Sequence, residues 1–349
     1  MITGTSKQNE LQYRSVMLDS SSSLKDFAQN RKKYYKKYIL NEEVEDEETK
    51  AMITGMIVET LLLEPELFDN KFYMSACASM PSGLMLAFVE ALYKYNIEAT
   101  NEEGVVMRDF ADISQDAYAE SGFKIKYEAV IGKFAGSDAE IYFNEILKVR
   151  TNNLTVVTTL DVTNAEKIVE ELKTNFVTKD IVNLVNSDRW EVHKQLQVEG
   201  YKIGNLQFKS MMDLVHLDHV NKLIQVYDLK TTWAIENFME DYYLYRKGWI
   251  QAYVYHCAIQ HYRNTNFPGY TISPIKFIVC DSTNYYNPLI YALTFDDLKE
   301  AKDGFEYKGR KYTGVIDIVN ELEWSVTNNI WNFSKANYES NGVVSLKKS

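Results

Sequence analysis

The stretch that decides the fold is SMMDLVHLDHVNKLIQVYDLKTT, Ser210 to Thr232. Its two halves have the composition and alternation of strands, and His219 to Lys222 separate them as a turn. In the antiparallel hairpin that this pattern predicts, Asp213 lies roughly opposite Asp228. Lys230 follows Asp228 by two residues, so the two side chains point to the same face of the strand.

Two carboxylates that face each other repel, so a fold that keeps them together needs a cation. Hard divalent ions such as Mg²⁺ or Mn²⁺ take carboxylate oxygens as ligands. An ammonium beside such an ion can hold a water nucleophile or neutralise charge that develops on a phosphoryl oxygen. Asp-x-Lys also occurs by chance as a surface ion pair of little energetic value. The hairpin is therefore a candidate metal site, with a plain ion pair as the alternative.

A helix after the hairpin carries two further candidates. It is expected from about Glu240 to Tyr262, and Gln251 and Tyr255 share one of its faces. A separate apolar stripe on this helix can pack on the sheet. The alternative interpretation is a surface glutamine and a tyrosine at the edge of the core.

Glu59 is a candidate from the N-terminal part of the chain. It lies in an otherwise apolar helix that ends near Pro65, so we expect partial burial. A buried carboxylate is costly without a cation or hydrogen-bond partners. The alternative places Glu59 on a narrow solvent-facing stripe with Met52 and Thr60.

The order of the predicted elements gives the fold class. Residues before about 188 are mostly helical, and the acidic residues 41–48 read as a solvated loop. One helix is expected to start at a Thr163–Asn164 cap. After residue 188 the pattern changes to strands, then the motif helix, a strand pair at 275–295 and a helical C-terminal region. This order predicts an α/β fold with a small mixed sheet and many helices on its N-terminal side.

Composition excludes several classes of protein. The 349 residues are 46% hydrophobic, enough for a sizeable core, and the three cysteines fit neither a disulfide framework nor a four-cysteine cluster. The first 15 residues lack the apolar segment of a signal peptide, and the longest apolar run is too short to span a bilayer. We therefore expect a soluble, cytoplasmic protein without a membrane partner. A net charge of −11 argues against a non-specific nucleic-acid coat protein, but not against an enzyme with a locally basic cleft.

Together these residues resemble the PD-(D/E)XK nuclease superfamily, and within it the phage and prophage recombination exonucleases related to exonuclease VIII, with a RecB-like nuclease domain. The family motif is an Asp, a hairpin to Asp/Glu-x-Lys, and a helix with Gln-x-x-x-Tyr. This chain has Asp213, Asp228-Leu229-Lys230 and Gln251-Ala-Tyr-Val-Tyr255 in that order. The family's N-terminal stretch is similar to SSSSLKDF, Gly55, Glu59 and LLLEPELF, although many relatives have His where this chain has Glu59.

The resemblance covers roughly residues 20–72 and 188–335. It implies a restriction-endonuclease-like core, with residues 1–72 contributing Glu59 and 188–349 holding the nuclease core. Residues 73–187 match no part of the family, and their helical spacing predicts a mostly helical insertion.

The resemblance also implies the chemistry. Asp213, Asp228, Glu59 and the Leu229 carbonyl would bind Mg²⁺, which Mn²⁺ can replace. Lys230 would orient and activate the attacking water. Gln251 and Tyr255 would support the site by hydrogen bonds to Lys230 or to the nucleic acid.

The implied activity is exonucleolytic hydrolysis of double-stranded DNA ends for recombination or repair, in a bacterial host if the chain is phage-encoded. Relatives suggest a single-strand annealing protein as a partner and a homo-oligomer as an assembly. Relatives with iron–sulfur clusters carry four cysteines, so no cluster is expected here. Two alternatives stay open, which are an endonuclease or nickase of the same fold and a catalytically silent relative that binds DNA or protein.

Basic residues that contact DNA are harder to place. The stretch Asn30 to Tyr38 interleaves basic residues with aromatics, which suits phosphates and a stacked base but also an ordinary solvated helix face. Lys209, Arg246 and Lys247 lie near the motifs and are further candidates.

Overall fold

A computed structural model of the chain describes residues 12–42, 49–152, 154–283 and 287–344. Most of the acidic loop predicted at 41–48, and most of the polar N-terminus, therefore lie outside the described residues.

The chain divides into two compact units, each described here by itself. The sheet unit holds Met1–Ala51, Leu62–Glu64 and Ile168–Ser349. The helical unit holds Met52–Leu61 and Pro65–Lys167. This division differs from the expected one, because the segment around Glu59 belongs to the helical unit and the chain from Ile168 onward belongs with the sheet.

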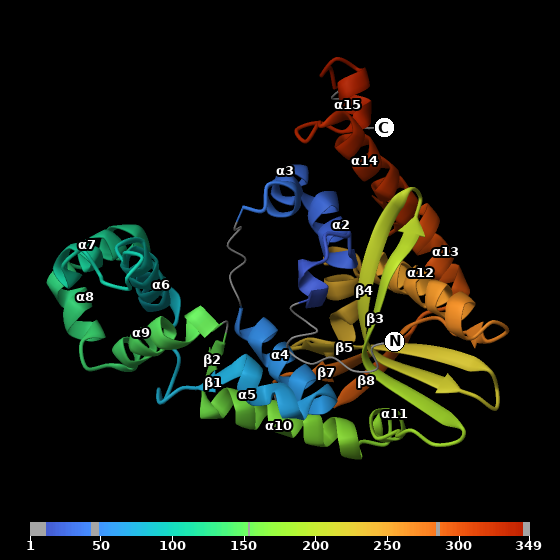
Figure 1. Cartoon of the computed structure of the whole chain (residues 1–349), viewed down its shortest axis with the longest axis horizontal. Helices are drawn as coiled ribbons and strands as arrows, with labels where there is room; N and C mark the ends of the chain where they lie inside the picture. Colours follow the sequence, from blue (N-terminus) through green and yellow to red (C-terminus); the bar gives the residue numbers. More distant parts are fainter. Residues whose placement is uncertain (1–11, 43–48, 153, 284–286, 345–349) are drawn as a thin grey trace. The chain divides into compact units, whose positions relative to one another are not determined.

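A mixed six-stranded sheet forms the centre of the sheet unit (Figure 1). Its strands are β3 (Trp190–Ile203), β4 (Leu206–Asp218), β5 (Leu223–Thr232), β6 (Thr271–Ile272), β7 (Lys276–Asp281) and β8 (Pro288–Ala292). The order is β3-β4-β5-β7-β8, and β6 pairs with β5 outside this path. β3, β4 and β5 are antiparallel neighbours, β5 and β7 are parallel, and β7 and β8 are antiparallel. The predicted mixed sheet, hairpin and later strand pair are confirmed.

The β4–β5 turn has a local cause that sets the register of the hairpin. The Asp218 carboxylate accepts hydrogen bonds from the backbone N–H groups of Val220 and Asn221, both at 3.0 Å. Lys222 completes the turn with a left-handed φ of 51°. Such side-chain-to-backbone bonds favour a tight turn. A slip of one residue would exchange the two faces of β4, so this turn fixes which side chains face Asp228.

Helix α12 (Gly248–Asn266) packs on β3 and β4 and also contacts α2 (Ser21–Gln29) and α13 (Phe295–Asp303). Its predicted apolar stripe is confirmed, because Ile250, Val254 and Ala258 are fully buried. Helix α2 begins with a reciprocal capping box between Ser20 and Ser23, which explains why the serine-rich stretch starts a helix. The contact of α2 with α12 thus joins two distant parts of the sequence.

Shorter elements complete the sheet unit. They are α3 (Arg31–Tyr34), η1 (Tyr35–Ile39), α11 (Lys179–Val182), η4 (Ile235–Asn237), η5 (Met239–Tyr245), β9 (Phe305–Tyr307), β10 (Arg310–Tyr312), α14 (Val315–Asn328) and α15 (Lys335–Glu339). Both η1 and η5 are π-helices.

Three predicted boundaries were wrong. The helix expected from Glu240 to Tyr262 is a π-helical segment, a break at Lys247 with a φ of 55°, and then α12. The C-terminal region is not wholly helical, because the β9–β10 hairpin turns at Lys308 and Gly309, which both have positive φ. Two consecutive residues of this kind match the twist of paired strands.

The third boundary concerns α10 (Thr159–Thr174), which contributes to both units. It starts four residues before the expected Thr163–Asn164 cap. Asp161 accepts a hydrogen bond from the Thr158 N–H at 3.0 Å, and Thr158 accepts one from the Asp161 N–H at 3.2 Å. This reciprocal cap begins the helix, so Thr163 and Asn164 lie in its interior.

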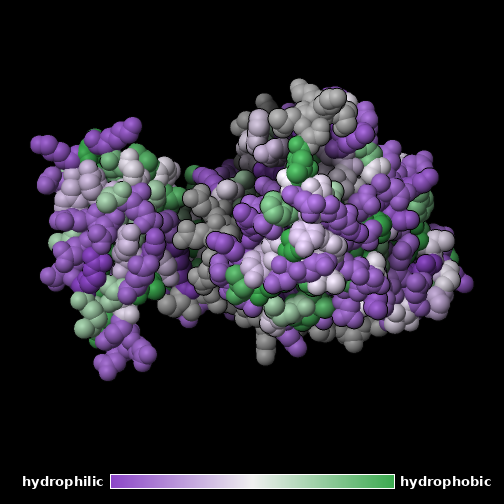
Figure 2. Space-filling view, turned by 90° about the horizontal axis from the view of Figure 1, so that it is seen from above, coloured by the Kyte–Doolittle hydropathy of each residue, from purple (hydrophilic) through white to green (hydrophobic). Residues whose placement is uncertain are grey.

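The helical unit contains short elements around a core of its own. They are most of α4 (Lys50–Leu63), η2 (Pro65–Leu67), α5 (Phe68–Lys71), β1 (Phe72–Met74), α6 (Gly83–Glu98), α7 (Phe110–Ser121), α8 (Tyr127–Phe134), α9 (Asp138–Val149), η3 (Arg150–Asn152) and β2 (Thr155–Val157). Its core includes Phe88, Leu92, Ile113 and Ile146, all fully buried. Hydrophilic residues dominate the face of this unit seen in Figure 2. Among the described helices, none is long and apolar enough to cross a bilayer.

Candidate active site

The two carboxylates of the hairpin lie just beyond the end of the paired part of β4 and β5. The last pair of this ladder is Leu214 with Tyr227, so the next step along the register sets Asp213 against Asp228. The Asp213 carboxylate accepts a hydrogen bond from the Leu229 N–H at 2.7 Å. Asp228 is 0% exposed and Asp213 8%. The predicted arrangement of the two acids is therefore present, and both charges are held away from bulk water.

Lys230 supplies the compensating charge. Its ammonium forms an ion pair with the Oδ2 atom of Asp228 and donates to the Leu229 carbonyl at 3.1 Å. Burial by itself would lower the pKa of Lys230, but Asp228 and the other negative groups nearby raise it above its ordinary value. The side chain is 23% exposed, so the ammonium is reachable from solvent while its partner is not. The Lys230 ammonium thus lies beside the Asp228 carboxylate and the Leu229 carbonyl, the groups that the sequence predicts as ligands of a metal ion.

Gln251 holds the other oxygen of Asp228. Its amide nitrogen donates to Asp228 Oδ1 at 2.8 Å. Its amide oxygen accepts hydrogen bonds from the Lys25 ammonium at 3.0 Å and from the Tyr242 hydroxyl. These two donors fix which end of the amide faces Asp228. Gln251 thus contacts the Asp228 carboxylate itself, and its predicted support of the site through Lys230 or the nucleic acid stays a prediction.

Tyr255 lies one helical turn beyond Gln251, with its ring buried. Its hydroxyl donates to the Met211 carbonyl at 2.7 Å, so it ties α12 to β4. Burial, with the negative charges of Asp228 and Asp213, raises the pKa of Tyr255 well above its usual value. Its place is that of a core-edge tyrosine that supports the strand carrying Asp213.

Lys25 and Tyr242 belong to the site and were missed from the sequence. Lys25 lies on α2 and Tyr242 in the π-helix η5, and the Lys25 ammonium stands 5.2 Å from the centre of the Tyr242 ring. Burial, followed by the positive charge of Lys230, lowers the pKa of Lys25 to about 7, while Asp228 opposes the shift. Nothing in the order of residues indicates that these side chains converge on Gln251, because the contact depends on how α2 packs on α12.

Glu59 lies in the helical unit, half-buried on α4, so its role as a fourth metal ligand stays a prediction. The alternative stripe is wrong, because Thr60 is 3% exposed whereas Met52 is 47% exposed.

The residues of the sheet unit suit a hard divalent cation. Within the described residues, no three acidic, histidine or cysteine side chains cluster as a metal site. Mg²⁺, however, is often held by only one or two carboxylates and keeps several waters. Asp213, Asp228 and the Leu229 carbonyl provide such a set of oxygen donors, and the buried Asp228 carboxylate already binds a cationic group. The donors therefore fit Mg²⁺ or Mn²⁺ if the Lys230 ammonium gives way.

Several basic residues proposed from the sequence have structural partners. The Lys209 ammonium donates to the backbone carbonyls of Tyr13, Arg14 and Val16 at 2.6, 3.1 and 2.8 Å. Lys33 pairs with Asp26 at 3.3 Å. Lys209 therefore anchors the N-terminal segment instead of facing a ligand.

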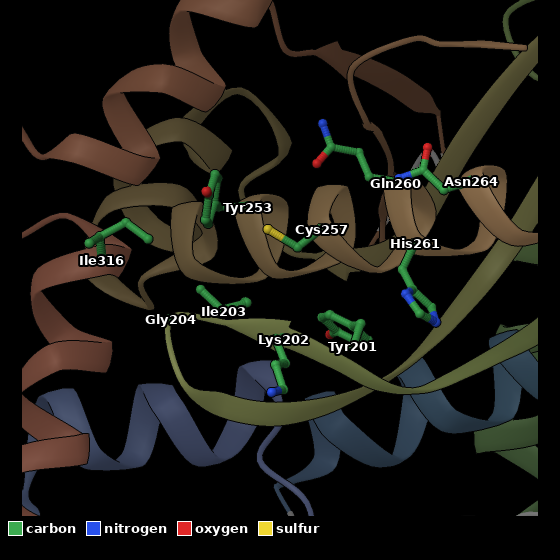
Figure 3. Close-up of a pocket in the computed structure, with 10 residues that line it drawn as sticks. All are labelled: Tyr201, Lys202, Ile203, Gly204, Tyr253, Cys257, Gln260, His261, Asn264 and Ile316. Carbon is green, nitrogen blue, oxygen red and sulfur yellow. The ribbon is translucent and has the colours of Figure 1, made fainter. Parts of the chain in front are cut away.

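A small cavity lies on another side of α12. Its volume is about 340 Å³, and Figure 3 shows Tyr253, Cys257 and Gln260 of α12 beside Tyr201 and the end of β3. Burial raises the pKa of the Cys257 thiol to about 11, which keeps it protonated. A protonated thiol is a poor nucleophile, and among the described residues no acidic side chain lines this cavity. It offers no chemistry comparable to that of the carboxylate site.

Comparison with known proteins finds a structural likeness at low sequence identity. No protein-family model matches the sequence. No curated protein matches it either. Among solved structures, it is similar to a provisionally assigned exonuclease from Eubacterium rectale, with 14% identity and a TM-score of 0.49. The alignment covers 99% of this chain and 96% of that chain. We transfer no residue role from a likeness of this size.

Proposed function

We propose that the chain is a metal-dependent DNA exonuclease of the PD-(D/E)XK type. The observation that carries the proposal is the fully buried Asp228 carboxylate. It lies opposite Asp213 in the β4–β5 hairpin and forms an ion pair with the Lys230 ammonium through one oxygen. Buried charged groups are costly as a purely structural device. Two such carboxylates suit a site that binds a divalent cation during the reaction.

The roles of the residues follow from their contacts. Asp213, Asp228 and the Leu229 carbonyl would hold Mg²⁺ or Mn²⁺. The metal, when bound, offsets the negative charge of a phosphodiester and activates water for attack. Gln251 keeps the Asp228 carboxylate in one orientation. The Lys230 ammonium lies next to these donors, where it can orient the attacking water or stabilise a phosphoryl oxygen.

The test is digestion of linear duplex DNA by purified protein in Mg²⁺ buffer and in EDTA. We expect Mg²⁺-dependent loss of DNA from the ends, and at least a hundredfold slower loss with Asp228→Asn or Lys230→Met. Asp296→Asn, on the exposed start of α13, is the matched control for loss of a carboxylate. Digestion by the site variants at the rate of this control would refute the assignment.

The form of the substrate separates the proposed activity from its alternatives. An exonuclease spares covalently closed circular DNA, whereas an endonuclease or nickase converts it to open or linear forms. A catalytically silent relative would bind linear DNA and leave it intact at every Mg²⁺ and Mn²⁺ concentration. A role in recombination, with a single-strand annealing protein as partner or in a homo-oligomer, is part of the proposal only if end-dependent digestion is found.

A further inference from the structure

A second cavity of the sheet unit has the chemistry of an anion site. Its volume is about 500 Å³, and it lies among α2, α3, the start of α12, β10 and α14. Five cationic side chains line it, and we call it the basic pocket. They are Arg31, Lys32, Lys247, Arg310 and Lys311.

Positive charge exceeds negative charge in the basic pocket. Only Asp317 and Glu321 are acidic among its lining residues, and Glu321 is paired with Arg31 at 2.6 Å. Within the described part of the chain, Lys247 and Arg310 are in no ion pair. Burial, followed by the positive charge of Arg310, lowers the pKa of Lys247. Two cations that repel each other in a cavity are stabilised by a bound anion.

The backbone turns sharply where Lys247 enters the pocket. Lys247 has a φ of 55°, a conformation that costs a non-glycine residue of the order of 1–2 kcal/mol. The next residue must be glycine, because a Cβ on Gly248 would lie 2.9 Å from the Tyr242 ring and from the Tyr243 Cα. The strained backbone at Lys247 follows the segment in which Tyr242 contacts Gln251. It also places the Lys247 side chain in the basic pocket. A strained residue held by its surroundings is a common feature of ligand sites.

Aromatic rings accompany the cations. Tyr245 lines the pocket and is 77% exposed, which is unusual for a ring of its size. Tyr312 is stacked on Phe305 with ring centres 4.8 Å apart, and Arg310 lies 5.4 Å from the Tyr312 ring centre. Flat rings beside unpaired cations are the combination that binds single-stranded nucleic acid, because bases stack while phosphates meet positive charge.

The basic pocket is next to the carboxylate site. Lys247 precedes Gln251 by four residues around the start of α12, a rise of about 6 Å. On α2, Lys25 is followed within one turn by Phe27 and Ala28, which line the pocket. Lys25 also experiences the positive charge of Lys247. A nucleic-acid strand at Asp228 would therefore meet the basic pocket within about one nucleotide.

We propose that the basic pocket binds a nucleotide of single-stranded DNA, with its phosphate between Lys247 and Arg310 and its base against Tyr245. This inference rests on the proposed function, because the strand it holds is the one that leads to or from the carboxylate site. The pocket then selects a frayed or resected single strand over intact duplex.

The experiment measures binding of a fluorescent oligothymidylate to the full chain in EDTA, where no hydrolysis occurs. Arg310→Glu should weaken binding about tenfold or more at 50 mM salt and lower the salt slope by about 0.7 for each phosphate that the variant no longer neutralises. Lys299→Glu makes the same charge change at an exposed site on α13 and serves as the control. Circular dichroism verifies that both variants are folded.

A second pair of variants tests the ring. Tyr245→Ala should weaken binding about tenfold, whereas Tyr245→Phe should keep it, since stacking needs the ring and not the hydroxyl. The proposal is overturned if Arg310→Glu binds the oligothymidylate like Lys299→Glu, or if Tyr245→Ala binds it like Tyr245→Phe. These binding results do not depend on digestion. If the unmutated chain binds the oligothymidylate but digests no DNA, the proposed nuclease activity is refuted while the proposed nucleotide site is not.

Discussion

Removal of the Lys230 ammonium is the sharpest perturbation of the buried site. In Lys230→Met, Asp228 would keep its hydrogen bond from Gln251 but lose its ion pair, while remaining 0% exposed. Breaking a buried pair by removing one partner costs about 3–5 kcal/mol, because a charge is left without compensation. Lys230 is 23% exposed, so water can partly replace it, and we expect the lower end of this range. A decrease of about 3 kcal/mol in unfolding free energy follows.

The assay is urea denaturation in EDTA at pH 7, with two comparison variants. Lys308→Met breaks an ion pair whose side chains are 68% and 57% exposed, so its loss should change the unfolding free energy little. The double variant Asp228→Asn/Lys230→Met removes both charges and should recover most of the loss.

Addition of Mg²⁺ extends the same assay. If Asp228 and Asp213 bind the ion, millimolar Mg²⁺ should stabilise Lys230→Met more than the parent, since no ammonium competes for the oxygens. A cost for Lys230→Met equal to that of Lys308→Met, with no Mg²⁺ dependence, would refute the assignment of Asp228 as a buried charge held by Lys230.

Three other predictions concern residues of the sheet unit around the site. Gly248→Ala should cost about 1–3 kcal/mol of unfolding free energy, because its Cβ would lie 2.9 Å from the Tyr242 ring. Gly132→Ala, in a helix with open space around the new Cβ, is the control and should not destabilise the chain. Tyr242→Phe removes one of the donors that orient Gln251 and should slow DNA digestion about tenfold, and an unchanged rate would contradict that role. Burial lowers the pKa of His216 to about 4, whereas an unfolded histidine titrates near 6.5. The unfolded state therefore binds the additional proton, so stability should fall by about 2 kcal/mol from pH 7 to pH 5. His216→Leu should remove this loss, and an identical pH profile for variant and parent would contradict the explanation.

The hairpin could be predicted because its information is local. Alternation fixes the faces of β4 and β5, and four turn residues fix the register, so Asp213 and Asp228 meet without knowledge of the rest of the chain. The same holds for Lys230, which shares the strand with Asp228. Secondary-structure periodicity was therefore enough to find the buried pair.

The partners of Gln251 could not be predicted in this way. The contact of its amide oxygen with Lys25 joins residues 226 positions apart and depends on the packing of α2 against α12. The break at Lys247 has one visible signal, the following Gly248, but a lysine in a left-handed conformation has no signature of its own. The β9–β10 hairpin does have one, since Lys308-Gly309 between alternating aromatic residues is a turn pattern.

Boundaries of helices depended on caps that the periodic pattern concealed. Thr158 and Asp161 form a capping box that the sequence could have predicted. The Thr163–Asn164 pair a few residues later fits the spacing of the apolar residues equally well. The place of Glu59 is a different case, because it depends on how a helix of one unit relates to a hairpin in the other.

The proposed function depends on Asp213, Asp228 and the Leu229 carbonyl as ligands of the divalent cation at which DNA is hydrolysed. The most direct measurement is a crystal structure of the chain with Mn²⁺, located by its anomalous scattering. We predict one Mn²⁺ bound to both carboxylates and the carbonyl, with the Lys230 ammonium displaced from Asp228. Mn²⁺ bound elsewhere, with the Lys230–Asp228 ion pair intact at millimolar concentrations of the metal, would contradict the claim.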